Sequence, residues 1–171
     1  METIMKMLKD RYEKDKDIQE LTQYIAGEGT NKEKEEVFYI GSKGLDQEHD
    51  KAAKQIIKMQ RALKKNNGRR MYHMIISFNT STKNLLKVKA VSKAVAKVIY
   101  EEGYLVYYGI HTSTDNLHIH FAIDSVNYLS GKKWHKSRSE FMSFRNKVLD
   151  CSCSVLASRN FLGSDEYSAW N

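Results

Sequence analysis

A short run of residues, 117–124, in which apolar and polar side chains alternate, constrains the fold more than any other stretch of the chain. Successive side chains of an extended strand point to opposite faces of a sheet. Leu117 and every second residue up to Ile123 would therefore share an apolar face. His118 and every second residue up to Asp124 would share a largely polar face. The sequence predicts a strand with two chemically different faces.

A second apolar run, residues 105–110, precedes this strand, and only the short polar link 112–116 separates the two. Strands joined by so short a link pair as an antiparallel hairpin, which would bring His111 opposite or diagonal to His118. His118 and His120 lie about 6.5 Å apart along one face of such a strand. Three imidazoles can then reach one cation and leave coordination positions open, as a catalytic metal requires. We predict a metal site at His111, His118 and His120.

The alternative is that these histidines have no metal-binding role. Two histidines at this spacing occur often by chance, and single histidines are mostly surface residues or hydrogen-bonded core residues. Spacing alone leaves both interpretations open. The neighbourhood favours the metal site, because the opposite face is apolar, a third histidine ends the preceding strand, and Asp115 lies beside them as a candidate to orient an imidazole.

Length and charge limit the class of protein. The 171 residues suffice for one domain with its own core, so we expect a single domain, 1–171, with 151–171 as a candidate frayed tail. Lys and Arg number 28 against 21 Asp and Glu, and the net charge of +7 suits a polyanionic partner. No run has the length of a membrane span, and the charged segment 1–17 lacks the apolar run of a secretory signal. We expect a cytoplasmic protein without membrane contact.

Two cysteines, Cys151 and Cys153, are separated by one residue. Neighbours this close are poorly placed to form a disulfide with each other, and no second cysteine pair provides a zinc site. We expect both to be free thiols.

A helix is predicted for residues 17–26, because Asp17 has the form of an N-cap with Glu20 three residues later, and apolar residues then repeat at helical spacing. Tyr24 lies at the edge of the apolar stripe, so its hydroxyl could emerge into a cleft. The residues alone favour the ordinary alternative, a boundary tyrosine with a packed ring and a hydrated hydroxyl.

Periodicity and turn residues predict the remaining elements, which are strands at 36–40 and 71–78 and helices at 49–65, 85–101 and 137–149. The hairpin requires antiparallel strands, so we expect an α+β fold, a two-layer sandwich whose largely antiparallel central sheet carries the histidines and is covered by helices. His73 should share the polar face of the strand at 71–78 and act as a hydrogen-bonding partner rather than a metal ligand.

A stripe of basic side chains follows one face of the helix at 49–65. Such stripes are usually solvated surface, but this one could track a phosphate backbone together with basic residues of two later turns. The candidate contacts are Lys54, Lys58, Arg61, Lys65, Arg69, Arg70, Lys132 and Lys133.

The segment from Gly109 to Asn127, followed by Gly131-Lys-Lys-Trp134, resembles the histidine motif of MobP-type plasmid and transposon mobilisation relaxases, which are HUH endonucleases. Two positions depart from the family pattern. Family members commonly carry Asp where this chain has Ser113, and Asn where it has Asp124. Neither change removes a histidine.

Three further segments resemble the family in the expected order. Leu21-Thr-Gln-Tyr24-Ile25 matches the place where the family carries its nucleophile, the strand at 36–40 resembles its second motif, and the strand at 71–78 contains Tyr-His-x-x-x-Ser-Phe. The resemblance identifies Tyr24 as the nucleophile, with Tyr12 and Tyr39 as competing candidates.

The resemblance implies site- and strand-specific DNA nicking at an origin of transfer by metal-dependent transesterification. Tyr24 would form a 5′-phosphotyrosyl intermediate, Asp115 would be a candidate base, and one divalent ion (Mn, Mg, Zn, Co or Ni) would be the cofactor. The partners would be single-stranded DNA, accessory relaxosome proteins and a coupling protein.

Three alternatives remain open. An HUH replication initiator or transposase would use the same chemistry on a different DNA site. A hydrolytic nuclease would use the metal to activate water and would form no adduct. A non-catalytic single-stranded DNA-binding protein would need neither Tyr24 nor a catalytic metal.

Overall fold

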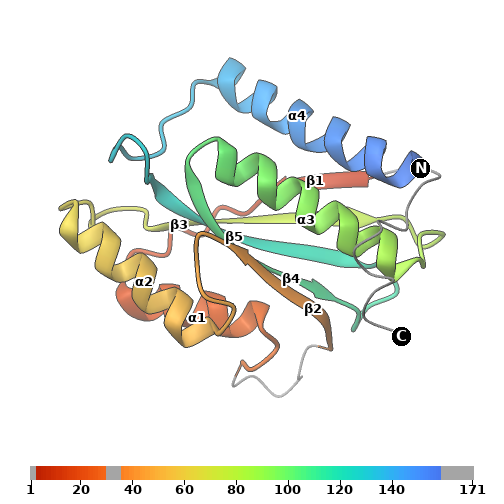
Figure 1. Cartoon of the computed structure of the whole chain (residues 1–171), viewed down its shortest axis with the longest axis horizontal. Coiled ribbons are helices and arrows are strands. Elements are labelled where there is room, and N and C mark those ends of the chain that lie inside the picture. Colours follow the sequence, from red (N-terminus) through yellow and green to blue (C-terminus); the bar gives the residue numbers. More distant parts are fainter. Residues whose placement is uncertain (1–2, 30–35, 159–171) are drawn as a thin grey trace, which may run out of the picture.

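The computed structural model describes residues 3–29 and 36–158, and it forms one antiparallel sheet with four helices (Figure 1). The strand order in the sheet is β1-β3-β5-β4-β2, and every neighbouring pair is antiparallel. In chain order the elements are β1 (Thr3–Met7), α1 (Asp15–Ile25), β2 (Val37–Lys43), α2 (His49–Ala62), β3 (Met71–Phe78), α3 (Leu85–Glu101), β4 (Tyr104–His111), β5 (His118–Asn127) and α4 (Arg138–Ala157). The predicted α+β class is confirmed.

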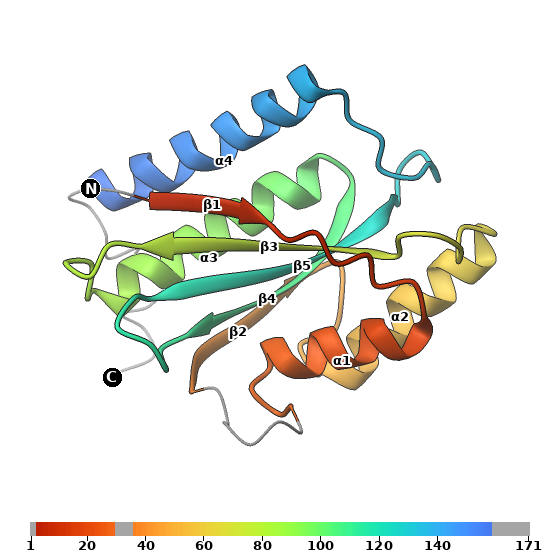
Figure 2. The same cartoon turned by 180° about the vertical axis from the view of Figure 1, so that it is seen from behind.

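The two faces of the sheet are covered by different helices. Helices α3 and α4 pack on one face and enclose the larger hydrophobic core. Helix α1 packs on the other face over β4 and β5, and α2 packs mainly against α1. Figure 2 shows α1 in front of the sheet with α3 and α4 behind it. The sandwich thus has helices on both sides, although α1 and α2 cover only part of their face.

The predicted hairpin of β4 and β5 is present, and His111 lies directly opposite His118 in its register. The alternation along β5 is also confirmed. Ile119 and Phe121 are fully buried against α3 and α4, whereas His120 faces α1. The period-two pattern therefore fixed which side chains face each group of helices.

Helix α1 begins earlier than predicted. Its first residue is Asp15, and Asp17 is the third helical residue rather than the N-cap. The Asp17 carboxylate instead accepts a hydrogen bond from the Lys14 N–H at 2.8 Å. Two acidic residues in the first turn suit the positive end of the helix dipole. Asp17 therefore does mark the beginning of the helix, but as its third residue.

Strand β1 was not predicted, because its five residues lie in a charged segment. It is an edge strand paired with β3, and it buries Met5 while Ile4 on the other side is 55% exposed. Helix α4 is longer than predicted and reaches Ala157, so residues 151–157 of the candidate tail are helical. Residues 159–171 lie outside the described part. Cys151 and Cys153 are on α4, and both are free thiols, as predicted.

No helix in the described ranges 3–29 and 36–158 has the length and apolar character needed to cross a bilayer.

Candidate active site

Helix α1 places Tyr24 against the histidine face of the sheet. Its buried side chains, among them Leu21 and Ile25, anchor the helix, and Tyr24 lies half-buried beside them. The centroid of the Tyr24 ring is 5.3 Å from that of His111 and 5.4 Å from that of His120. The residue predicted as nucleophile and two predicted metal ligands are therefore neighbours, although they come from three different elements.

A glycine in β4 allows this close approach. A Cβ atom at Gly109 would lie 2.6 Å from the carbonyl oxygen of Ile25, at the end of α1. Such a contact is too short for any side chain, so only glycine lets the end of α1 rest on β4 at this point. The same carbonyl accepts a hydrogen bond from Nε2 of His111 at 3.0 Å. Helix end, glycine and histidine thus form one packing unit.

The carbonyl bond defines the protonation of His111. A carbonyl oxygen can only accept, so Nε2 of His111 carries a proton, and in the neutral ring Nδ1 carries the lone pair. His118, which is half-buried, is defined in the same way. The Thr114 hydroxyl donates to the Asn116 carbonyl at 2.8 Å, so it accepts from Nδ1 of His118 at 3.1 Å, and in the neutral ring the lone pair then lies on Nε2.

His120 is held by a different kind of partner. Its Nδ1 is 2.9 Å from Nε2 of His73, and Nδ1 of His73 is 3.0 Å from the hydroxyl of Tyr12. The rings of His111 and His120 lie close, with centroids 4.3 Å apart. Burial lowers the pKa of His73 to about 4 and, with the neighbouring imidazoles, that of His120 to about 2. Both rings are neutral at pH 7, which is the form that binds metals.

The donor set suits a borderline divalent cation. Within the described residues, no three His, Cys, Asp or Glu side chains are already grouped as they would be around an ion. The chemistry of the three predicted ligands nevertheless fits. His111 and His118 each hold their second nitrogen in a hydrogen bond, which is how proteins orient metal-binding imidazoles, and His120 does so through His73.

Asp115 is exposed in the link between β4 and β5, and its backbone carbonyl accepts a hydrogen bond from Lys83 at 2.7 Å. The hydrogen bonds of the histidines described above go to Thr114, the Ile25 carbonyl and His73 instead. A catalytic role for Asp115 stays a prediction. Thr114 was not predicted, because its only local signal was its place in a short polar link four residues before a strand histidine.

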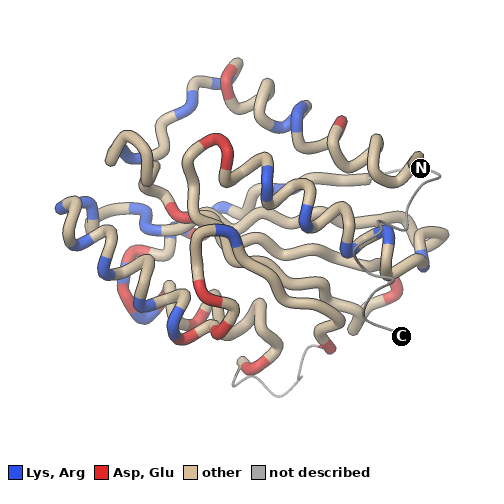
Figure 3. The backbone as a smooth tube through the Cα atoms, in the orientation of Figure 1, with Lys and Arg blue, Asp and Glu red and all other residues tan. Residues whose placement is uncertain are grey.

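The predicted DNA contacts divide into two groups. Lys54, Lys58 and Arg61 are exposed on α2, where Figure 3 shows a succession of basic residues. Arg70 is 3% exposed, and its guanidinium binds Asp15 at 2.8 Å and also Gln60. Its contacts hold α1 and α2 to the sheet.

Arg69 and Lys133 also have structural contacts. Arg69 donates to three backbone carbonyls in the loop before α1, and its guanidinium lies 4.5 Å from the Tyr72 ring centroid. Lys133 donates to the carbonyl of Asn67 at 2.7 Å. Lys65 is half-buried and Lys132 exposed. A DNA contact stays a prediction for all eight residues. Arg69, Arg70 and Lys133 already have the structural contacts described above, and Arg61 pairs with Asp15.

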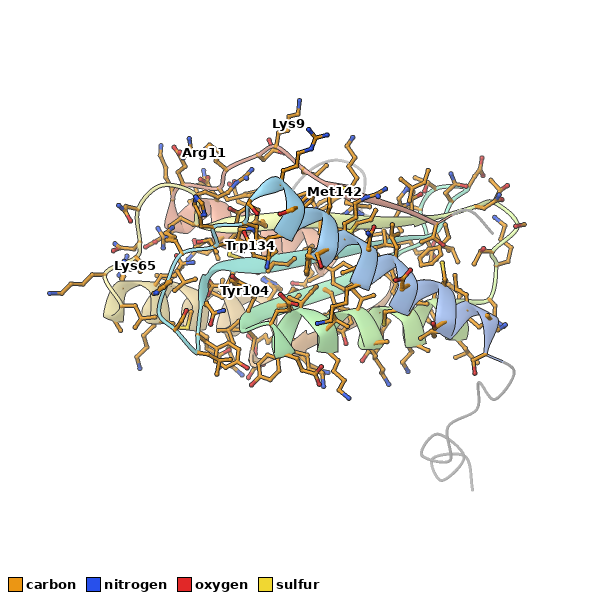
Figure 4. The ribbon with its side chains drawn as sticks, turned by 90° about the horizontal axis from the view of Figure 1, so that it is seen from above. Lys9, Arg11, Lys65, Tyr104, Trp134 and Met142 are labelled. Atoms are coloured by element: carbon orange, nitrogen blue, oxygen red, sulfur yellow. The ribbon has the colours of Figure 1, made fainter. Side chains whose placement is uncertain are left out.

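Two aromatic residues lie on the other side of the sheet. Tyr39 packs on Tyr108, with ring centroids 6.1 Å apart, in the core beneath α3. It therefore faces away from the histidines and is a poor candidate for the nucleophile. Trp134 packs between Tyr72 and Tyr104, at centroid distances of 4.9 and 4.7 Å, and Figure 4 shows it next to Tyr104. Its partly buried ring packs against the core.

Comparison with known families and structures agrees with this arrangement. Residues 24–150 match the family model for the nuclease domain of MobA/VirD2-like relaxases. The chain belongs to the MobA/VirD2-like relaxases. The match begins at Tyr24 and contains all four clustered histidines, so it covers the site described above.

The relaxase fold is also found in a solved structure. A chain from work on the molecular basis of vancomycin resistance transfer in Staphylococcus aureus matches with a TM-score of 0.53 and 14% sequence identity. The match covers 75% of this relaxase domain and 74% of the other chain, and at this identity it shows the fold alone. A comparison with curated proteins finds no match.

Proposed function

We propose that this relaxase domain nicks one DNA strand at an origin of transfer and keeps the cut end covalently on Tyr24. The observation that carries the proposal is the position of the Tyr24 ring, which lies against both His111 and His120 on the partly covered face of the sheet. A phenol beside imidazoles that can hold a divalent ion suits metal-assisted attack on a phosphodiester. Membership of a relaxase nuclease family supports DNA as the substrate.

The three histidines would hold one divalent ion through Nδ1 of His111 and Nε2 of His118 and His120. When bound, such an ion polarises the phosphate and neutralises charge that develops in the transition state. Imidazole favours Mn, Zn, Co or Ni over Mg, but phosphate and water oxygens would complete the coordination, so Mg also remains in the proposal.

The covalent step exchanges one ester for another. The Tyr24 oxygen attacks phosphorus and forms a bond to it, while the bond from phosphorus to the 3′-oxygen breaks. The phenol loses its proton, and the departing 3′-oxygen gains one and becomes a hydroxyl. The 5′-phosphate stays on Tyr24 as a diester, so attack by the 3′-hydroxyl can reverse the step and rejoin the strand.

Deprotonation of the nucleophile needs assistance, because an ordinary tyrosine titrates near pH 10. Asp115 is retained as a candidate base from the sequence, and an Asp115→Asn variant that nicks at the normal rate would exclude it. The exposed cations of α2 would attract the strand through its phosphates, and accessory transfer proteins would act as further partners in the cytoplasm.

The decisive experiment compares Tyr24→Phe with the unmodified protein on labelled single-stranded origin oligonucleotides with Mn²⁺. With the label on the fragment 3′ of the nick, which carries the 5′-phosphate, we expect a protein-sized shift on denaturing gels, its loss with chelator, and a drop of about 10⁴-fold or more in adduct formation in the variant, because removal of a nucleophile has effects of this size. Tyr39→Phe is the matched control, because it removes a phenol hydroxyl on the opposite face.

Other outcomes would favour the alternatives. Cleavage without adduct would indicate a hydrolytic nuclease, and binding without cleavage would indicate a DNA-binding protein. An adduct that persists in Tyr24→Phe and vanishes only when Tyr12 is also changed would make Tyr12 the nucleophile. Cleavage of a replication origin or a transposon end in preference to a transfer origin would indicate an initiator or a transposase.

A further inference from the structure

We infer that Tyr12 is a positioning residue, which acts through His73 on His120 and supplies the final hydrogen-bond acceptor when His120 presents Nε2 to a metal ion. The inference rests on the proposed function for its purpose, but its geometry stands alone. Two hydrogen bonds form a continuous chain from the Tyr12 hydroxyl through His73 to His120, with lengths of 3.0 and 2.9 Å. We call these three residues the Tyr12 chain.

The Tyr12 chain matters because it controls the one ligand whose protonation is otherwise undefined. The Ile25 carbonyl defines the proton position on His111. The Thr114 hydroxyl, which donates its own proton to Asn116, defines the proton position on His118. The partner of His120 is another imidazole, and an imidazole nitrogen can either donate or accept. The direction of the chain therefore decides whether Nε2 of His120 carries a proton or a lone pair.

Only one direction permits metal binding. If Tyr12 donates to His73, then His73 donates to Nδ1 of His120, and the proton of His120 lies on Nε2. If Nδ1 of His120 donates to His73, then His73 donates to the Tyr12 oxygen, and Nε2 of His120 carries the lone pair. A phenol hydroxyl serves both directions because it both donates and accepts. Without it, Nδ1 of His73 loses its partner and the second direction loses its final acceptor.

The backbone around Tyr12 is built for this contact. Its φ angle is 49°, in the left-handed region that a bulky residue rarely adopts. Strain of this kind persists only where the surroundings enforce it, and it is common at functional sites. Here the Arg70 N–H donates to the Tyr12 carbonyl at 3.0 Å, and Leu8 donates to the carbonyl of His73 at 2.8 Å.

Arg69 completes the support of the loop. Its guanidinium donates to the carbonyls of Lys9 and Asp10, each at 2.9 Å, and Arg69 and Arg70 immediately precede β3, which carries His73. The loop is thus tied to the strand that it contacts through Tyr12. A tyrosine kept only for packing would need no such alignment of its hydroxyl with a buried imidazole.

The test uses Tyr12→Phe, which keeps the ring and removes the hydroxyl. Nitrogen-detected NMR of the imidazoles gives the proton position on His73 and His120, and titration with Zn²⁺ or Mn²⁺ gives the metal affinity. We expect a changed distribution of tautomers at His73 and His120 in the variant and a metal affinity lower by about tenfold, the smaller end of what loss of an indirect partner causes. Tyr39→Phe is the control, because it removes a hydroxyl from the opposite face.

A nicking assay separates positioning from catalysis. Saturating Mn²⁺ should restore adduct formation in Tyr12→Phe but not in Tyr24→Phe, because only the first variant loses affinity rather than the nucleophile. Unchanged tautomers and unchanged affinity in a folded Tyr12→Phe protein would overturn the inference, as would an equal change in Tyr39→Phe.

The two proposals fail separately. If the unmodified protein binds metal and forms the adduct while Tyr12→Phe behaves identically, only the inference about Tyr12 is wrong. If the unmodified protein binds no metal, the proposed function is wrong, and the tautomers of the metal-free proteins still test the Tyr12 chain. If Tyr12→Phe does not fold, the unmodified protein still decides, because a His73 Nδ1 without a hydrogen bond in its spectrum would contradict the chain.

Discussion

The two faces of β5 are both buried, yet they are buried in different ways. Phe121 and Ile119 are fully buried among apolar side chains beneath α3 and α4. On the other face His120 is 7% exposed and Asp124 is fully buried, and each depends on specific hydrogen bonds. Burial of a polar group costs free energy unless a partner compensates it. One face therefore supplies stability through apolar burial, and the other holds polar groups that depend on their hydrogen-bond partners.

Adjacent residues of β5 offer the largest test of this difference. Phe121→Ala should lower the free energy of unfolding by about 3–5 kcal/mol, because it removes buried apolar surface and leaves a cavity. His120→Ala should lower it by less, about 1–3 kcal/mol, since it leaves the buried Nε2 of His73 without its partner, but should abolish metal-dependent adduct formation. Urea unfolding and the gel assay on the same samples measure both quantities.

The assigned roles of the two faces would be wrong if Phe121→Ala abolished activity or His120→Ala affected only stability. A fully active but equally destabilised His120→Ala protein would assign the polar face to stability. A folded Phe121→Ala protein with no adduct formation at low temperature would show that the apolar face contributes to the site.

Asp124 provides a test of intermediate size through pH. Burial raises the pKa of its carboxyl to about 7, against about 3.9 in an unfolded chain. Between these values the folded state binds the extra proton, so the contribution of Asp124 to stability falls as pH rises from about 4 to about 7. Asp124→Asn is neutral throughout, and it should be more stable than the unmodified protein by about 1–3 kcal/mol at pH 8 and similar at pH 4.

Urea unfolding at pH 4, 6 and 8 would measure this difference. The amide of the Asp124→Asn variant would keep a side-chain oxygen to accept from Gln60, at the position where Oδ1 of Asp124 accepts at 2.7 Å. A stability difference that does not change with pH would mean that Asp124 is ionised in the folded state and that the surrounding Arg70 and Lys133 outweigh its burial.

The exposed cations should give the smallest effects. Lys58→Ala should leave the free energy of unfolding within about 0.5 kcal/mol and reduce the salt dependence of single-strand binding by about 0.7 in the log–log slope, if Lys58 contacts one phosphate. Lys97→Ala on α3 is the control, because its side chain is 68% exposed on the other side of the sheet. Equal salt-dependence slopes for both variants would argue against a contact between α2 and the DNA strand.

Much of the fold could be predicted from the sequence because its signals are local. The period of two along 71–78 and the helical period along 85–101 gave β3 and α3 their observed bounds. The alternation around His118 and His120 also gave the correct faces. These patterns depend only on neighbours in the chain, so no knowledge of the tertiary structure was needed.

The parts that were missed depend on distant partners. β1 has only five residues and lies in a charged segment, and its pairing with β3 joins residues about seventy positions apart. The Tyr12 hydroxyl reaches His73 only because the loop before α1 has an uncommon backbone angle. Arg70 carries the same charge as the exposed cations of α2, and residue type alone could not reveal that it is buried against Asp15.

Gly109, beneath the end of α1, would have to be kept if this site were transferred to another protein. A design that copied the tyrosine and the histidines alone would omit Gly109, which has no side chain and no chemical part in the reaction. Yet an alanine there would push the Ile25 carbonyl away from the sheet. The acceptor of His111 and the neighbouring Tyr24 would shift with it. The spacing between Tyr24 and the histidines thus depends on the absence of a Cβ atom at residue 109.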